Sequence, residues 1–144
     1  MTALHRPEWS LPALDAFNRD WFTSGRIAVQ QCSACATLQH PPEEICAACG
    51  STTFTSRTLA PTGTVYSFTI VHHAANGALA PAIPYAVVVV ALDDAPDLRV
   101  VGNLLDATVE EVAIGLRVEA VWDERPSDDG ETIRLPQWRR RGGT

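Results

Sequence analysis

The sequence predicts a mainly β protein with an N-terminal helix, a cysteine-rich ribbon and a five-stranded barrel. Residues after position 63 fall into five runs rich in β-branched side chains, and all four cysteines lie between positions 26 and 58. An aromatic pattern at helical spacing precedes the cysteines. A chain of 144 residues has room for one domain with a real core and one small appendage. We therefore expect a helical segment at 1–25, a ribbon at 26–60, a barrel at 61–138 and an arginine-rich tail at 139–144.

The N-terminal helix is expected from Ser10 to Gly25. Ser10 is a candidate N-cap, Pro12 suits the first turn, and Gly25 is typical of a C-terminal stop. One helical face carries apolar side chains, namely Leu14, Phe17, Trp21 and Phe22. Two interpretations are open: this stripe packs on the chain's own ribbon or barrel, or part of it docks a partner, since aromatic residues are enriched at interfaces. The candidate docking residues are Phe17, Trp21 and Phe22.

Five strands are expected, at residues 64–73, 85–92, 98–105, 116–124 and 132–138, each bounded by Pro, Gly, Asp or Asn. Between the third and fourth strands, Thr108 and Glu111 have the spacing of a capping box, which predicts one or two helical turns ending at Gly115. A five-stranded barrel with a helix at this place in the order is the arrangement of an OB-fold.

The cysteines form two C-x2-C knuckles separated by ten residues: Cys32, Cys35, Cys46 and Cys49. Two residues between cysteines let both thiolates of a knuckle face one ion, and two knuckles complete a tetrahedral shell for zinc. Four thiolates leave no open position, so the metal is expected to be structural. Spacing alone does not distinguish zinc from iron. Free or disulfide-bonded cysteines are the disfavoured alternative in a cytoplasmic protein.

Composition excludes several functions for this chain. The net charge of −6 argues against a nucleic-acid partner held through phosphates. All eleven basic residues are arginine, so lysine-dependent Schiff-base, pyridoxal phosphate and P-loop mechanisms are excluded. The longest apolar run, 85–92, is far shorter than the roughly 20 residues needed to cross a bilayer. Since the N-terminus also lacks a signal-peptide pattern, we expect a cytoplasmic protein without a membrane partner.

Histidines and the C-terminal arginines are the remaining candidates for chemistry. His72 and His73 are adjacent at a strand end, so their side chains should point to opposite faces, which favours a surface role over catalysis. The one concentrated basic patch is Arg139, Arg140 and Arg141, directly after Trp138. This patch is either a solvated tail or a clamp for the phosphates of an adenine nucleotide or coenzyme A, with the indole stacking on the purine.

These motifs together resemble a known family: small acyl-CoA-associated proteins built from a rubredoxin-like zinc ribbon and an OB-fold, catalogued as domain of unknown function thirty-five. The resemblance covers nearly the whole chain. It rests on the helix ending at Gly25, the two knuckles, and the segments 63–69 (GTVYSFT), 84–89 (PYAVVV) and 114–118 (IGLRV). Family members commonly finish the barrel with a Phe-Arg-Pro-like strand, and residues 133–136 (IRLP) match that strand more loosely.

The resemblance implies an accessory subunit that binds a thiolase-like enzyme in a hetero-oligomer and helps hold its acyl-CoA substrate, in lipid, steroid or polyketide-type metabolism. Catalysis would then belong to the partner, in agreement with a chain that lacks lysine and any spare thiol. Two alternatives are open. The OB-fold could bind single-stranded nucleic acid, although Tyr66 and Phe68 have no basic neighbours in sequence. A stand-alone acyl-CoA hydratase or aldolase would need His72 or His73 to meet a carboxylate in a pocket.

Overall fold

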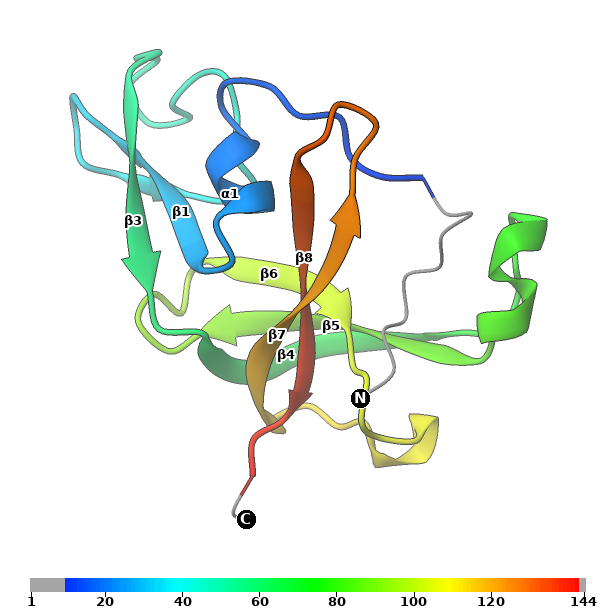
Figure 1. Ribbon diagram of the computed structural model, residues 1–144. Helices are drawn as coiled ribbons and strands as arrows, with labels where there is room; N and C mark the ends of the chain where they lie inside the picture. The colour runs from blue at the N-terminus through cyan, green and yellow to red at the C-terminus, as the bar shows by residue number, and fades with distance from the viewer. Residues whose placement is uncertain (1–9, 143–144) are drawn as a thin grey trace.

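The structure, a computed structural model, describes residues 10–142 and contains two antiparallel sheets that follow one another along the chain. The first sheet has the strand order β2-β1-β3, and the second has the order β6-β5-β4-β7-β8. The short helix α1 (Arg19–Thr23) lies between the first sheet and β8 (Figure 1). The predicted mainly β fold is confirmed. Within residues 10–142 no helix combines the length and the hydropathy that a membrane-spanning segment requires.

The first sheet is the ribbon, made of β1 (Ile27–Cys32), β2 (Leu38–Gln39) and β3 (Phe54–Leu59). Both outer strands pair antiparallel with β1. The half of the ribbon nearest the barrel is buried, because Ile27, Val29 and Leu59 join the main core. The other half carries the cysteines.

The second sheet contains β4 (Thr62–Val71), β5 (Tyr85–Leu92), β6 (Arg99–Asn103), β7 (Arg117–Pro126) and β8 (Thr132–Arg140). All five predicted strands are present. Burial alternates along β5, so that the side chains of Ala86, Val88, Val90 and Leu92 face the core. The boundary expected between residues 138 and 139 falls inside β8, because this strand pairs with β7 as far as Arg140.

The second sheet curls into the partly open barrel of an OB-fold. Its two edge strands, β6 and β8, approach each other at a single parallel bridge between Leu104 and Trp138 among the described residues. The amide of Leu105 donates to the carbonyl oxygen of Trp138 at 2.9 Å. The barrel is therefore held together at this seam by packing and a few hydrogen bonds, not by a continuous ladder.

Two 3-10 helices connect barrel strands: η1 (Gly77–Ala82) before β5 and η2 (Val109–Glu111) before β7. The second was predicted from the capping-box spacing. Its Thr108 hydroxyl donates to the Glu111 carboxylate at 3.0 Å, although neither side chain caps a backbone amide. A turn with Gly115 at φ 94° follows.

The helix predicted from Ser10 to Gly25 is much shorter than expected, and residues 1–9 of the predicted helical segment lie outside the described residues. Asp15 Oδ1 accepts hydrogen bonds from the amides of Phe17 and Asn18, and Asn18 Oδ1 accepts from the amide of Asp15. This reciprocal pairing is a capping box that satisfies first-turn amides without helical partners and fixes the start of the helix here, so α1 is formed only from Arg19 onward. The predicted C-terminal stop is confirmed, since Gly25 has φ 69° directly after the helix.

Candidate functional site

The four cysteines converge on one point at the end of the ribbon that lies away from the barrel. Their Sγ atoms all lie within 4.8 Å of one another. The Sγ atoms of Cys32 and Cys49 are 3.5 Å apart, and those of Cys35 and Cys46 are 3.7 Å apart. A zinc ion with Zn–S bonds of about 2.3 Å places its sulfurs about 3.8 Å apart in a regular tetrahedron. The donor set and its spacing therefore fit a structural zinc ion.

The backbone of each knuckle turns in the same way. The amide of Ala36 donates to the Cys32 carbonyl and the amide of Gly50 to the Cys46 carbonyl, both at 2.9 Å. Both turning residues have positive φ, 64° at Ala36 and 79° at Gly50. Glycine adopts this conformation without strain, whereas alanine does not. The first knuckle accordingly forms despite its alanine, at some cost in backbone strain.

The thiols differ in acidity because their hydrogen-bond partners and their contacts with neighbouring sulfurs differ. A hydrogen bond from the Cys35 amide lowers the pKa of Cys32 to about 6, and hydrogen bonds with Thr37 lower the pKa of Cys35. The pKa of Cys49 is raised to about 12: the Ser51 amide lowers it, but the neighbouring sulfurs of Cys32 and Cys35 outweigh that effect. Four thiolates so close together require a cation, which a bound metal would supply.

Two glutamine side chains hold the segment that leads into the second knuckle. Gln30 is buried, its Nε2 donates to the Glu43 carbonyl at 2.7 Å, and its Oε1 accepts from the Glu43 amide at 3.0 Å. Gln39 Nε2 donates to Gln30 Oε1 at 2.6 Å, and Gln39 Oε1 accepts from the Ala47 amide at 3.0 Å. The loop at 43–47 is therefore fixed by β1 and β2. Sequence reasoning missed this pair, because the partners are backbone groups of an irregular loop.

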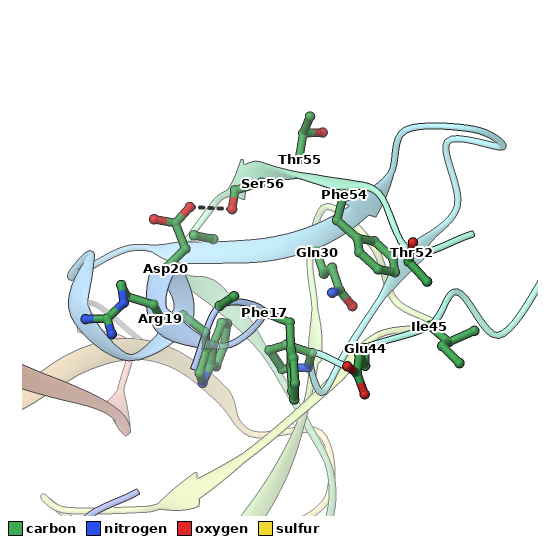
Figure 2. A pocket seen from close by; sticks show the side chains of 14 residues that line it. Phe17, Arg19, Asp20, Gln30, Glu44, Ile45, Thr52, Phe54, Thr55 and Ser56 are labelled. Carbon is green, nitrogen blue, oxygen red and sulfur yellow. Dashed lines mark hydrogen bonds between the residues drawn. The ribbon is translucent and has the colours of Figure 1, made fainter. Parts of the chain in front are cut away.

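A groove of about 1010 Å³ lies between the α1 segment and the ribbon. Figure 2 shows Phe54 between Asp20 on one side and the loop of Glu44 and Ile45 on the other, with Phe17 lying between Arg19 and Glu44. Ile45 is 55% exposed, whereas Phe17 and Phe54 are half-buried. Asp20 accepts a hydrogen bond from the Ser56 hydroxyl, which ties α1 to β3. The groove combines apolar walls with the acidic rim of Glu44.

The three predicted docking residues do not form one exposed face. Trp21 is buried in the main core at 5% exposure, with its ring centroid 4.2 Å from that of His40, and Phe22 packs against the same core. Of the three, only Phe17 lines the groove without being part of the main core. The short helix turns its large aromatics inward because it bridges the ribbon and β8. The interpretation that the stripe packs on the chain's own domains thus holds for Trp21 and Phe22.

A second cavity, of about 490 Å³, lies at the junction between ribbon and barrel. His40 lines it beside Trp21, and burial lowers the pKa of this imidazole to about 4. No described residue hydrogen-bonds its Nδ1 atom. Sequence reasoning gave His40 no role, since its environment depends on the contact between the two sheets.

The C-terminal arginines pair with carboxylates of the barrel. Arg139 Nε lies 3.0 Å from Glu119, Arg141 Nη1 lies 3.7 Å from Asp93, and Arg140 contacts both Asp106 and Glu111. Trp138 is fully buried, so its indole cannot stack on a bound purine as the sequence suggested. The arginines are therefore an ion-paired edge of the barrel rather than a free tail.

The other sequence candidates lie apart from these cavities. His72 and His73 are exposed after the end of β4 and line neither the groove nor the junction cavity, and His5 lies outside the described residues. Tyr66 does have a basic neighbour, contrary to expectation: the Arg99 guanidinium lies 3.7 Å from its ring centroid. This contact arises because β4, β5 and β6 are adjacent in the sheet, and the sequence separation of the two residues concealed it.

A four-cysteine ribbon followed by a five-stranded OB-fold defines the class of this protein as a zinc-ribbon–OB protein. Residues 23–55 match the family described as the ChsH2 rubredoxin-like zinc ribbon domain, and residues 56–123 match the ChsH2 C-terminal OB-fold domain. The chain belongs to this ChsH2 (DUF35) family. The resemblance inferred from the sequence is confirmed.

Three relatives illustrate the family. A DUF35 domain-containing scaffold protein of Methanocaldococcus jannaschii is 34% identical over 102 residues, 70% of each chain. A probable enoyl-CoA hydratase alpha subunit of Thermomonospora curvata is 36% identical over 131 residues, which are 89% of this chain but 39% of that protein. The chain thus spans well under half of that relative. A solved structure titled Ltp2-ChsH2(DUF35) aldolase matches with a TM-score of 0.73 and 33% identity, over 90% of this chain and 98% of that chain.

Proposed function

We propose that this chain is a non-catalytic accessory subunit that docks a thiolase-like enzyme through the groove between the ribbon and α1, and helps to hold an acyl-CoA substrate. The observation that best supports docking is the groove itself. Its walls combine the half-buried rings of Phe17 and Phe54 with the exposed side chain of Ile45. Aromatic and aliphatic side chains around a recess are the usual anchor sites of an interface.

The rigidity of the groove supports the same proposal. Its ribbon wall is fixed by the cysteine cluster and by the hydrogen bonds of Gln30, and its α1 wall is tied to β3 through Asp20. A surface that keeps its shape in the free subunit loses less conformational entropy on association. A metal-stiffened ribbon is therefore well suited to docking.

The chemistry of the chain agrees with a partner that performs the reaction. The four cysteines form one site for a single metal ion, and the two exposed histidines line neither described cavity. The names of the relatives point the same way, since one is a scaffold protein and another belongs to an aldolase complex. The thiolase-like character of the partner follows from the family resemblance.

The proposed coenzyme A contacts are the guanidinium groups of Arg139, Arg140 and Arg141. Each already has a carboxylate partner, so a phosphate would have to replace Glu119, Asp106, Glu111 or Asp93 in these ion pairs. Surface ion pairs are weak enough for such an exchange, and a phosphate offers bidentate geometry in return. Phosphate binding at this edge is the weaker half of the proposal.

Co-expression with thiolase-like proteins encoded in the same genome tests the proposal. We expect a stable hetero-oligomer, turnover of a CoA thioester by the pair, and none by this chain alone. Ile45→Asp should abolish the complex while retaining one equivalent of zinc, whereas Ile114→Asp, at a 70% exposed site on the barrel, should not affect it. Robust turnover by the single chain, or failure of every such protein to bind it, would overturn the proposal.

A further inference from the structure

We propose that the junction cavity between ribbon and barrel binds a small organic carboxylate with an apolar body. This cavity adjoins the docking groove, with Trp21 and Pro42 lining both, but the inference does not depend on the proposed function. Its volume of about 490 Å³ lies within the range of about 300–1,000 Å³ typical of small-molecule sites. Its apolar walls come from strands β6 and β8 of the barrel, from the α1 segment and from the prolines that follow β2, among them Trp21, Phe22, Pro41, Val101 and Leu135.

The positive charge at this cavity is supplied by Arg99, which lines it from β6. Eight of the ten arginines in residues 10–142 lie within 4.0 Å of a carboxylate oxygen; the exceptions are Arg57 and Arg99. The Arg99 guanidinium stacks on the Tyr66 ring at 3.7 Å. Stacking occupies the face of the guanidinium and leaves its in-plane N–H donors available, in the fork geometry that fits a carboxylate.

Two further polar groups of the cavity lack complete hydrogen bonding within the described residues. His40 Nδ1 is buried without a partner. The buried Gln137 accepts a hydrogen bond at Oε1 from the Asn103 amide at 2.7 Å, and no described residue accepts from its Nε2. A buried polar atom left unpaired is costly, so His40 Nδ1 marks a place where a ligand atom or a water would be bound. A cation and unpaired polar atoms within apolar walls together indicate an amphipathic anion.

The test uses the zinc-loaded full chain, without any partner, titrated with hexanoate and followed by NMR. We expect saturable shifts of the His40 imidazole and Val101 amide signals, and much weaker shifts with the uncharged probe hexan-1-ol. Arg99→Gln should weaken hexanoate binding about tenfold or more, the usual effect of losing a charge-assisted hydrogen bond. Arg57→Gln is the matched control, because Arg57 also lacks a carboxylate partner but lies on β3 outside the cavity, and it should leave the affinity unchanged.

A second variant keeps the test informative if Arg99→Gln disturbs the sheet. Val101 is 60% exposed, so Val101→Asp places a negative charge on the cavity wall without burying it, and should also weaken hexanoate binding. Equal binding of hexanoate by all variants, equal binding of hexan-1-ol, or shifts confined to residues outside the cavity would overturn the proposal. None of these outcomes bears on partner docking, which is measured separately.

Discussion

The backbone of Gly102 lies directly against the indole of Trp138. A Cβ atom at Gly102 would be 2.8 Å from Trp138 Cδ1 and 3.0 Å from Nε1, closer than real side chains approach. This contact is two residues from the Leu104–Trp138 bridge, where the edge strands of the barrel meet. The seam of the barrel is thus closed by an indole that fits only against a glycine.

Gly102→Ala should therefore destabilise the barrel. Trp138 is fully buried and cannot move aside, so the added methyl group should cost about 1–3 kcal/mol, as overpacked core substitutions do. Chemical denaturation of the zinc-loaded protein measures this loss. Gly77→Ala is the control, because nothing lies within 4 Å of a Cβ at that position. Equal stability of the two variants would show that the seam tolerates the extra atom.

Loss of one ligand should unfold the ribbon. We expect Cys46→Ser to retain well under one equivalent of metal, since three thiolates bind zinc far less tightly than four and the ribbon's distal half has little apolar burial of its own. Metal analysis and limited proteolysis between residues 32 and 53 measure the two effects. Ser33→Ala, an exposed change in the first knuckle, should preserve both the metal and protease resistance. A metal-free ribbon that stays ordered would contradict the prediction. One equivalent of iron in the wild-type protein would contradict the assignment of the metal as zinc.

Stability should fall on acidification because of His40. Burial lowers its pKa from 6.5 to about 4, so between these values the unfolded chain binds more protons than the folded chain. The neutral ring makes its full contribution to the free energy of unfolding above about pH 6.5. This contribution is lost as the pH falls and levels off below about pH 4, which lowers the free energy of unfolding by about 3 kcal/mol in total. His40→Phe, which cannot titrate, should show a flatter profile over this window.

Metal release also occurs on acidification, because protons compete for the thiolates. Zinc release must therefore be followed in parallel with a chromophoric chelator, and its midpoint should be the same in wild type and His40→Phe. NMR titration of the His40 ring provides the direct check. An ordinary pKa near 6.5 would show that the imidazole is not buried in solution.

Trp21 and Phe17 should separate stability from docking. Trp21→Ala should cost about 3–5 kcal/mol of unfolding free energy, because it removes a buried indole from the contact with His40. Phe17→Ala should leave the stability nearly unchanged and weaken the complex with a thiolase-like partner, since Phe17 lines the groove and is not part of the core. Thermal denaturation and partner titration measure both. The reverse pattern would show that α1 is docked differently.

Single-stranded DNA and RNA should bind only weakly. The net charge is −6, and the C-terminal arginines are paired with carboxylates, so few cations are available to phosphates. Fluorescence anisotropy with labelled oligonucleotides at about 150 mM salt measures this binding. A dissociation constant in the low micromolar range or below would contradict the prediction, because it is tighter than ordinary non-specific binding. Tyr66→Ala would then show whether the pair of Tyr66 and Arg99 serves as the stacking platform.

The positions that sequence alone determined are those where the physical cause is local. The distance between Cys32 and Cys35 along the chain sets which thiolates of a knuckle can share an ion, and the β5 alternation sets which valines face inward. Gly25 ended the helix as expected for the same reason, because a left-handed residue is a property of one backbone position.

Tertiary structure decided every feature that depends on which distant groups become neighbours. The same arginine run is consistent with a free tail or an ion-paired strand until β8 brings Arg139 beside Glu119. The spacing of Trp21 is consistent with packing on the chain itself or with docking a partner, and it becomes core because the ribbon and β8 enclose α1. The Arg99 guanidinium contacts the Tyr66 ring, and the His40 imidazole is buried from solvent, only in the packed structure. Burial and charge pairing are properties of the packed chain, so no local pattern determines them.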